Sequence, residues 1–346
     1  MVFKAGLRRK MRKATMDRGY LATIPAGCGV RGAGFRNLAL GLIGTVMDSE
    51  SFYDINEKIN NAAFSKNGHC FLLIDASLEQ YQSEAFLSDI LRDYKSYPVK
   101  FHQRELHGAL PLYLFPLSTL SERDGQLFNN SIYHSLNELK VEKLDSGEGR
   151  SVCAWISTDL TGGQLAEQIA LSVVQPIQSV GDILLRYFDP SVFGLLMHIL
   201  DKWQKQQLLR NINAWSYIDG DGMVQVVNGD GECKKKLNYS LGLTELNFSE
   251  MSRILVINKI LRAYRKMGVV HKLSECEMVN LLRPALGYYY STFSPSDNDV
   301  INFGLDVLNA QRLFYQGGVF SKYIDNCGAH LQLYSDIRSR IESQAC

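Results

Sequence analysis

The sequence predicts an α/β lobe followed by an all-helical lobe. Between residues 68 and 211, short apolar runs of strand length alternate with amphipathic stretches. This alternation is typical of α/β layers, and we expect a mixed or mostly parallel sheet. Beyond residue 240 only the helical period remains. The 346 residues, 46% of them hydrophobic, are enough for about two domains.

Three segments follow from changes in composition. Residues 1–46 are basic and rich in glycine, residues 47–232 carry the alternating pattern, and residues 240–346 carry the helical one. The basic run Lys234–Lys236 marks the boundary between the two lobes. No low-complexity linker separates them, so we expect the lobes to share an interface rather than move freely.

The overall charge excludes partners that bind through bulk electrostatics. The formal net charge is +1, from 37 basic and 36 acidic side chains, so we expect neither a nucleic-acid nor a membrane partner. The seven cysteines are scattered and never form C-x-x-C, which favours reduced thiols in a cytoplasm over a disulfide framework or a zinc site. We detect neither an export signal nor an apolar run of about 20 residues that could span a membrane.

The first segment contains the sharpest sign of an enzyme. Gly27–Gly32 matches the dinucleotide-binding pattern, and Asp48 follows at about the spacing of its ribose-binding acid. That pattern needs a strand before it and a helix after it, whereas Pro25 precedes the first glycine and further glycines follow. We therefore expect 1–46 to be a disordered or non-native extension, with Met47 as a candidate start. A nucleotide-binding enzyme is the alternative.

In the α/β lobe, elements are assigned from the length and period of their apolar residues. Three apolar runs of strand length predict strands at Cys70–Ala76, Ser151–Ser157 and Ile183–Phe188. Helical spacing predicts helices at Glu79–Tyr94, Leu127–Leu139, Gln164–Val174 and Ser191–Asn211. The apolar run Leu106–Leu117 contains two prolines, so it is predicted as an edge strand or an irregular connection. Trp215–Val227 is predicted as a hairpin because Asp219–Gly222 reads D-G-D-G.

In the helical lobe, caps and glycines set the predicted boundaries. Ser249–Met267 carries one apolar face and ends before Gly268. Ser274 and Glu277 match a capping box, which begins a helix to Leu282. The last two helices are predicted from Ser296 to about Tyr315 and over Lys322–Ser343.

The stretch Ile183–Pro190 combines a strand, a cap and a helix start. Asp189 can accept hydrogen bonds from the first helical turn, and Pro190 suits the first helical position. Arg186 is the anomaly, because a permanent charge at the end of a buried strand needs a partner. Asp75, at the end of an earlier strand, is a candidate for an ion pair with it.

These residues carry a resemblance to a known family. The motif R-Y-F-D-P, formed by Arg186, Tyr187, Phe188, Asp189 and Pro190, follows an earlier strand that ends L-L-I-D-A at Leu72–Ala76. Together they resemble the type VI secretion effector chaperones, or adaptors, of the Tap or TEC kind. The similarity covers about Gly68 to Tyr217, with a looser match to Cys346.

The resemblance implies a cytoplasmic adaptor without catalytic activity. Such a protein would bind the amino-terminal region of one toxin effector and load it onto the VgrG spike protein, in the service of competition between bacteria. A structural accessory subunit of the secretion machine is a second alternative. We expect no catalytic residue, cofactor or metal.

The candidates for partner recognition are the aromatic side chains Tyr288, Tyr289, Tyr290 and Phe293. Tyrosines combine apolar area with a polar group and are enriched at interfaces. The alternative is that these rings pack between the two lobes.

Motifs that would bind metals do not match. Asp219, Asp221 and Asp230 suggest a calcium loop, but an EF-hand needs an oxygen ligand and a glycine at its fifth and sixth positions. Counted from Asp219, those positions hold Met223 and Val224, so we predict a turn. His102 and His107 have no third ligand, and His69 and its neighbour Cys70 should point to opposite faces of a strand.

Overall fold

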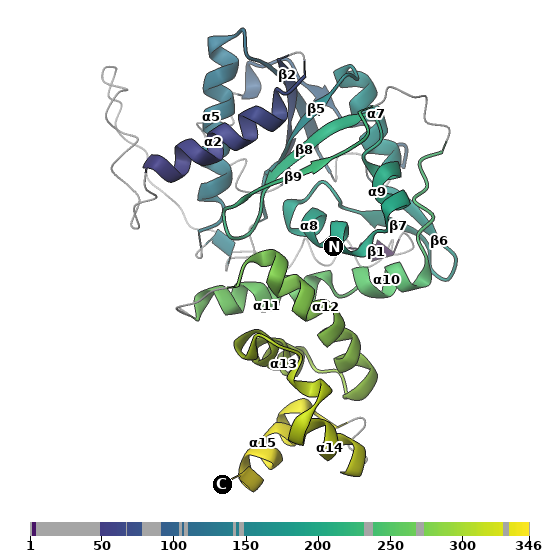
Figure 1. Cartoon of the computed structure of the whole chain (residues 1–346). Helices are drawn as coiled ribbons and strands as arrows, with labels where there is room; N and C mark the ends of the chain where they lie inside the picture. Colours follow the sequence, from purple (N-terminus) through teal and green to yellow (C-terminus); the bar gives the residue numbers. More distant parts are fainter. Residues whose placement is uncertain are drawn as a thin grey trace, which may run out of the picture.

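The chain folds into an α/β lobe and a helical lobe stacked end to end (Figure 1). The computed structural model describes residues 2–4, 49–66, 68–77, 91–103, 106, 110–140, 143–144, 149–231, 238–267, 273–327 and 332–345. Most of the predicted extension 1–46, the greater part of the predicted helix Glu79–Tyr94, and Lys234–Lys236 lie outside these residues.

A six-stranded sheet forms the centre of the α/β lobe. Its order across the sheet is β3 (Tyr97–Pro98), β4 (Leu112–Ser118), β2 (His69–Asp75), β5 (Val152–Thr158), β8 (Ile212–Ile218) and β9 (Val224–Asn228). Each neighbouring pair runs antiparallel. The expected mixed or mostly parallel sheet is therefore wrong.

The order of the strands explains this correction. Strands β4 and β5 run in the same direction and are joined by helix α5 (Glu122–Asn137), as a strand–helix–strand pattern predicts. However, β2 lies between them and pairs antiparallel with both. The alternating sequence pattern thus predicted the strand–helix–strand connection but not which strands lie side by side. The result is a split β-α-β unit, in which a third strand separates the two connected strands.

Strand β4 contains the proline that made it a predicted edge strand. Pro116 lies opposite Phe71 of β2, while β3 pairs only with Tyr113 and Leu114. Strand β3 therefore ends before it reaches Pro116, which needs no N–H on that side. The predicted edge strand or irregular connection is therefore wrong, because β4 lies between β3 and β2, and its proline is tolerated where β3 has ended.

Helices cover both faces of the sheet, because alternate strand residues face opposite sides. Leu72 and Ile74 join one core cluster with α5 and α2 (Ser49–Ala63). Leu73 joins the other cluster, with α7 (Gly162–Ser172), α8 (Pro190–Ile199) and α9 (Lys202–Leu208). The α/β lobe is thus a three-layer sandwich.

The predicted strand Ile183–Phe188 belongs to a second, smaller sheet. It is described as β7 (Gly181–Leu185), which pairs antiparallel with β6 (Val174–Ile177) and β1 (Val2–Lys4). Strand β6 was not predicted. Because β7 ends at Leu185, the charged Arg186 follows the strand rather than lying inside it.

Two predicted helices are interrupted. The predicted helix Ser191–Asn211 breaks at Leu200, and Asp201 starts α9 with a capping box to Gln204. A side chain that satisfies free N–H groups can thus begin a new helix inside a continuous apolar pattern. The predicted helix Ser249–Met267 breaks between α10 (Glu245–Met251) and α11 (Ile254–Lys266), where Arg253 makes no side-chain capping bond.

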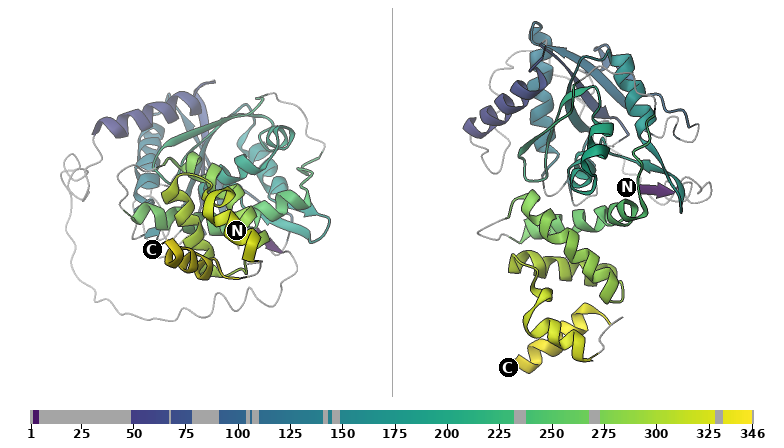
Figure 2. Two further views of the ribbon diagram at one scale, coloured as in Figure 1. Left: turned by 60° about the horizontal axis from the view of Figure 1, so that its bottom comes forward. Right: turned by 45° about the vertical axis from the view of Figure 1, so that its right-hand side comes forward.

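The helical lobe continues with α12 (Glu275–Thr292), α13 (Asp297–Ala310), α14 (Gly318–Cys327) and α15 (Tyr334–Ala345), and extends away from the sheet in the right-hand view of Figure 2. The predicted capping box of Ser274 and Glu277 is confirmed. Helix α12 runs past Leu282 and through Pro284, so it is longer than expected. The predicted last helix is two helices.

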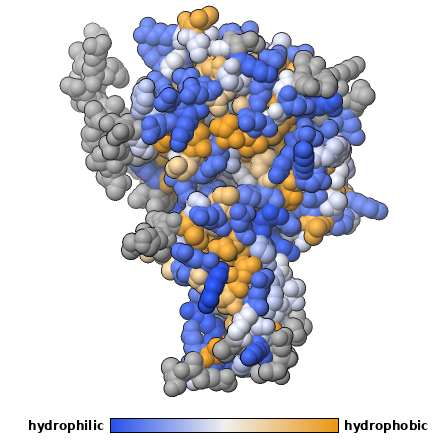
Figure 3. All heavy atoms as spheres, in the orientation of Figure 1, coloured by the Kyte–Doolittle hydropathy of each residue, from blue (hydrophilic) through white to orange (hydrophobic). Residues whose placement is uncertain are grey.

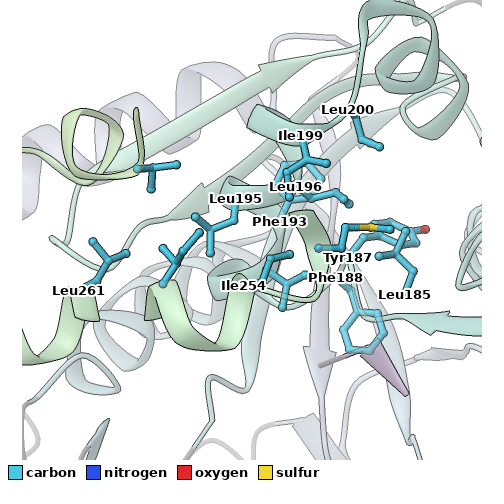
Figure 4. Close-up of a cluster of buried hydrophobic side chains, with 14 of the residues drawn as sticks. Leu185, Tyr187, Phe188, Phe193, Leu195, Leu196, Ile199, Leu200, Ile254 and Leu261 are labelled. Atoms are coloured by element: carbon cyan, nitrogen blue, oxygen red, sulfur yellow. The ribbon is translucent and has the colours of Figure 1, made fainter. Parts of the chain in front are cut away.

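Both lobes share one hydrophobic core. The larger cluster of buried side chains extends from the sheet through α8 into α11, α12 and α13. Figure 4 shows side chains of α8 beside Ile254 and Leu261 of α11. The expected interface between lobes is confirmed. None of the helices in the described part of the chain is long and apolar enough to cross a bilayer.

Gly304 of α13 is expected to be intolerant of any side chain. A Cβ there would lie 2.4 Å from Cδ1 of Ile260, which is fully buried in α11. We predict that Gly304→Ala lowers the free energy of unfolding by about 1–3 kcal/mol, as overpacking does. Denaturant unfolding monitored by circular dichroism measures this change.

The matched control is Gly125→Ala in α5, where a Cβ would have no neighbour within 4 Å. Helix propensity alone should then stabilise the protein by up to about 1 kcal/mol. Equal effects of the two substitutions would show that α11 and α13 are not packed as described.

Candidate functional site

Strand ends gather polar groups at the edge of the sheet that faces the helical lobe. Strands β2 and β8 end there, with Asp75 and Asp219, and the antiparallel β5 begins there after Ser151. Helices α11 and α12 pack close to this edge (Figure 1). We call these polar groups and the R-Y-F-D-P motif the junction.

The expected ion pair between Asp75 and Arg186 is present. Arg186 Nη2 lies 2.7 Å from Oδ2 of Asp75, whose side chain is 1% exposed. The other carboxylate oxygen accepts from the backbone N–H and the hydroxyl of Ser77, at 2.9 and 2.5 Å. The Arg186 guanidinium also lies over the Phe188 ring, 5.2 Å from its centroid. The pair joins the end of β2 to the motif, although their strands are in different sheets.

The rest of the motif forms the predicted cap and a buried aromatic cluster. Asp189 accepts from the N–H and hydroxyl of Ser191, and Pro190 occupies the first turn of α8. Tyr187 and Phe188 are buried, and the Tyr187 ring lies 5.8 Å from that of Trp215 in β8. The motif therefore holds β8, α8 and the small sheet together.

Cys153 of β5 lies close to these charges but is not poised as a nucleophile. Burial raises the pKa of its thiol, and the nearby carboxylates of Asp75 and Asp189 raise it further. Arg186 opposes this effect only in part. The neutral thiol is the favoured form, so Cys153 behaves as a small buried hydrophobe.

A second buried polar group was missed by the sequence analysis. Glu138, fully buried at the end of α5, accepts from the N–H and hydroxyl of Ser151 at 2.7 and 2.5 Å. His134 Nε2 lies 3.3 Å from the same carboxylate and 3.2 Å from the Ser151 hydroxyl. In a catalytic triad, histidine bridges serine and acid through its two nitrogens. Here both meet Nε2, so the group orders the start of β5.

The predicted hairpin turn is present, and it also links the two lobes. Asp219 accepts from the N–H groups of Asp221 and Met223, each at 2.9 Å. Arg265 of α11 donates to Asp221 at 2.8 Å and to Glu275 of α12 at 2.5 Å. The backbone N–H of Gly220 also donates to Glu275, at 2.9 Å. The turn is thus bound to two helices of the other lobe.

These acids are also the group in the described part of the chain that could hold a metal ion. Ligand oxygens of Asp219, Asp221 and Glu275 lie within 4.8 Å of one another. Arg265 already supplies positive charge to two of them, and backbone N–H groups bind all three. The arrangement therefore works as an ion-pair joint without a metal.

Burial and charge act in opposite directions on this joint. Burial raises the pKa of Glu275, and Arg265 lowers it only partly. Burial alone would lower the pKa of Arg265, but the carboxylates of Glu275 and Asp221 outweigh it and raise that pKa. We take Glu275 as ionised, because the guanidinium and the Gly220 N–H both donate to it.

The predicted partner-binding aromatics lie mostly inside the helical lobe. Tyr289 and Phe293 are 0% and 1% exposed, and Tyr288 stacks on Tyr315 with centroids 4.3 Å apart. Burial assigns these rings to packing within the lobe, rather than between lobes. Tyr290, 36% exposed, is the ring for which partner binding stays a prediction.

The remaining sequence candidates are dispersed. His69 is exposed and Cys70 is buried, so they face opposite sides of β2 as expected. His102 is exposed. His107 and the glycine-rich segment Gly27–Gly32 lie outside the described residues.

Comparisons with known proteins give one short match. No protein-family model and no solved structure match the chain. A stretch of 29 residues, 8% of the chain, is 76% identical to Escherichia coli K12 proteins described as putative uncharacterized protein YafF and H repeat-associated putative transposase YhhI. The match spans about half of YafF, 47%, and 8% of YhhI. Such a match assigns no family to the chain.

The Asp75–Arg186 pair should show strong energetic coupling. We predict that Asp75→Ala or Arg186→Ala alone lowers the free energy of unfolding by about 3 kcal/mol, because each leaves a buried charge unpaired. The double variant should lose less than the sum, by about 1–2 kcal/mol. Urea unfolding of all four proteins gives the coupling; additive losses would argue against the pair.

Arg265 should contribute more to stability than an exposed arginine that also pairs with two acids. Removing it in Arg265→Met leaves two partly buried carboxylates, so we predict a loss of about 2–3 kcal/mol, close to that of buried pairs. The control is Arg338→Met: Arg338 also pairs with two acids, but its side chain is 47% exposed. There the loss should be below about 1 kcal/mol in the same measurement. Equal losses of stability in the two variants would contradict the ion-pair joint around Arg265.

Proposed function

We propose that this chain is an adaptor that binds another polypeptide, of the type VI secretion effector-chaperone kind. It would hold one toxin effector through the effector's amino-terminal region and deliver it to the VgrG spike. The comparisons name no member of that family, so the proposal rests on the motif and on its place in the structure.

The observation that carries the proposal is the role of the motif. The residues that define the resemblance, Asp75 and Arg186 to Pro190, form one buried or half-buried unit at the junction. Their side chains form an ion pair, cap a helix and pack in the core, and these contacts maintain the two-lobed shape. A fixed shape is what a protein needs if it works by presenting surfaces to another chain.

Exposed apolar side chains on this frame support binding of a polypeptide. Trp203 of α9 is 52% exposed and Leu246 of α10 is 70% exposed. They belong to neighbouring segments, because the next residue after each, Gln204 and Asn247, share a hydrogen bond of 3.1 Å. Tryptophan is among the residues that contribute most to protein interfaces.

The proposal predicts one dominant partner in the native bacterium. Affinity purification of the tagged chain, followed by mass spectrometry, should recover the toxin effector encoded beside it, and deletion of the chain should stop that toxin reaching VgrG. Trp203→Ala should weaken the capture, whereas Tyr53→Ala, which removes a ring on α2 that is 68% exposed, should not.

Two results would contradict the proposal. Recovery of many components of the secretion machine would favour the structural subunit. A rise in thermal stability with dinucleotides would favour the nucleotide-binding enzyme, because a ligand that binds the native state must stabilise it.

A further inference from the structure

Among the residues that the structure describes, strand β9 is an edge strand without the usual protection against pairing. It lies at the end of the sheet order and reads V-Q-V-V-N, with no charged residue and no proline. Proteins commonly block such edges with lysine, proline, bulges or a covering element. The opposite edge strand, β3, has two residues and includes Pro98.

The hydrogen-bond pattern shows which backbone groups of β9 face outward. The N–H of Asp219 donates to the carbonyl of Met223, and the N–H of Gly229 donates to that of Asn213. Hydrogen-bonded pairs alternate along an antiparallel ladder. Backbone groups of Val224, Val226 and Asn228 therefore point away from β8, and within the described residues none of them has a hydrogen-bond partner.

We propose that β9 pairs with β9 of a second copy of this chain, so that two sheets join across a twofold axis at Val226. The three outward residues are spaced symmetrically about Val226. An antiparallel twofold then sets Val226 opposite Val226 and Val224 opposite Asn228, and each such pair exchanges two hydrogen bonds. No like charges meet, since the strand carries none.

Surface features beside β9 fit the same symmetry. Val226 and Met223 are 39% and 53% exposed, and Figure 3 shows an apolar area where Figure 1 draws β8 and β9. The twofold register sets Met223 of each copy opposite Gly229 of the other, so the pairing would cover this exposed methionine.

A charge exchange at the twofold axis tests this proposal. The chain should elute as a dimer in size-exclusion chromatography with light scattering. Val226→Lys alone and Val226→Glu alone should each be monomeric, because two like charges would face each other across the axis. An equimolar mixture of the two variants should recover the dimer.

The control is Leu255→Lys, which adds the same charge at a site on α11 that is 47% exposed and should leave the dimer intact. A monomeric wild-type chain at all concentrations would overturn the proposal. So would a dimer that survives Val226→Lys, or variants that fail to recover a dimer when mixed although circular dichroism shows both folded.

Amide hydrogen exchange gives a test that needs no variant. Pairing buries the outward N–H groups of Val224, Val226 and Asn228, so their exchange should slow as protein concentration rises. The N–H groups of Gln225 and Val227, which face β8, should show no such dependence. Exchange at Val226 that is independent of concentration would refute the pairing even if another face dimerises.

Discussion

The contact on which the rest depends is the buried ion pair of Asp75 with Arg186. A carboxylate at 1% exposure is tolerated because Arg186 and Ser77 satisfy its oxygens. That requirement fixes where the chain goes after β7, since Arg186 must reach the end of β2. Once it does so, Asp189 can cap α8, and α8 can present its apolar face to α11. One electrostatic need thus sets the geometry between the two lobes.

A second set of charges, farther along the same edge of the sheet, also fixes the position of the helical lobe. The hairpin turn at Asp219 to Gly222 meets Arg265 and Glu275, so the helical lobe is held by ion pairs as well as by the shared core. Apolar packing supplies most of the free energy, whereas the directional contacts select one orientation. The two lobes consequently form one body with a defined surface, which suits a protein that acts by contact.

Local chemistry made part of this predictable from sequence. Asp189 with Pro190, Ser274 with Glu277 and the D-G-D-G turn each act within a few residues, so their structures follow from the sequence itself. Strand neighbours are set by contacts distant in the chain, and no local pattern shows that β2 lies between β4 and β5. Glu138 and Ser151 escaped notice for the same reason, because neither has a signature until folding brings them together.

The central place of β2 has a consequence for synthesis of the chain. This strand is apolar on both faces, and it leaves the ribosome before either strand that pairs with it. Its backbone groups stay open until β4 has been made, and one side stays open until β5 follows. During that interval the nascent chain exposes an apolar strand with unpaired backbone groups, which is prone to aggregation. We expect chaperones to bind this stretch, and slow translation to prolong its exposure.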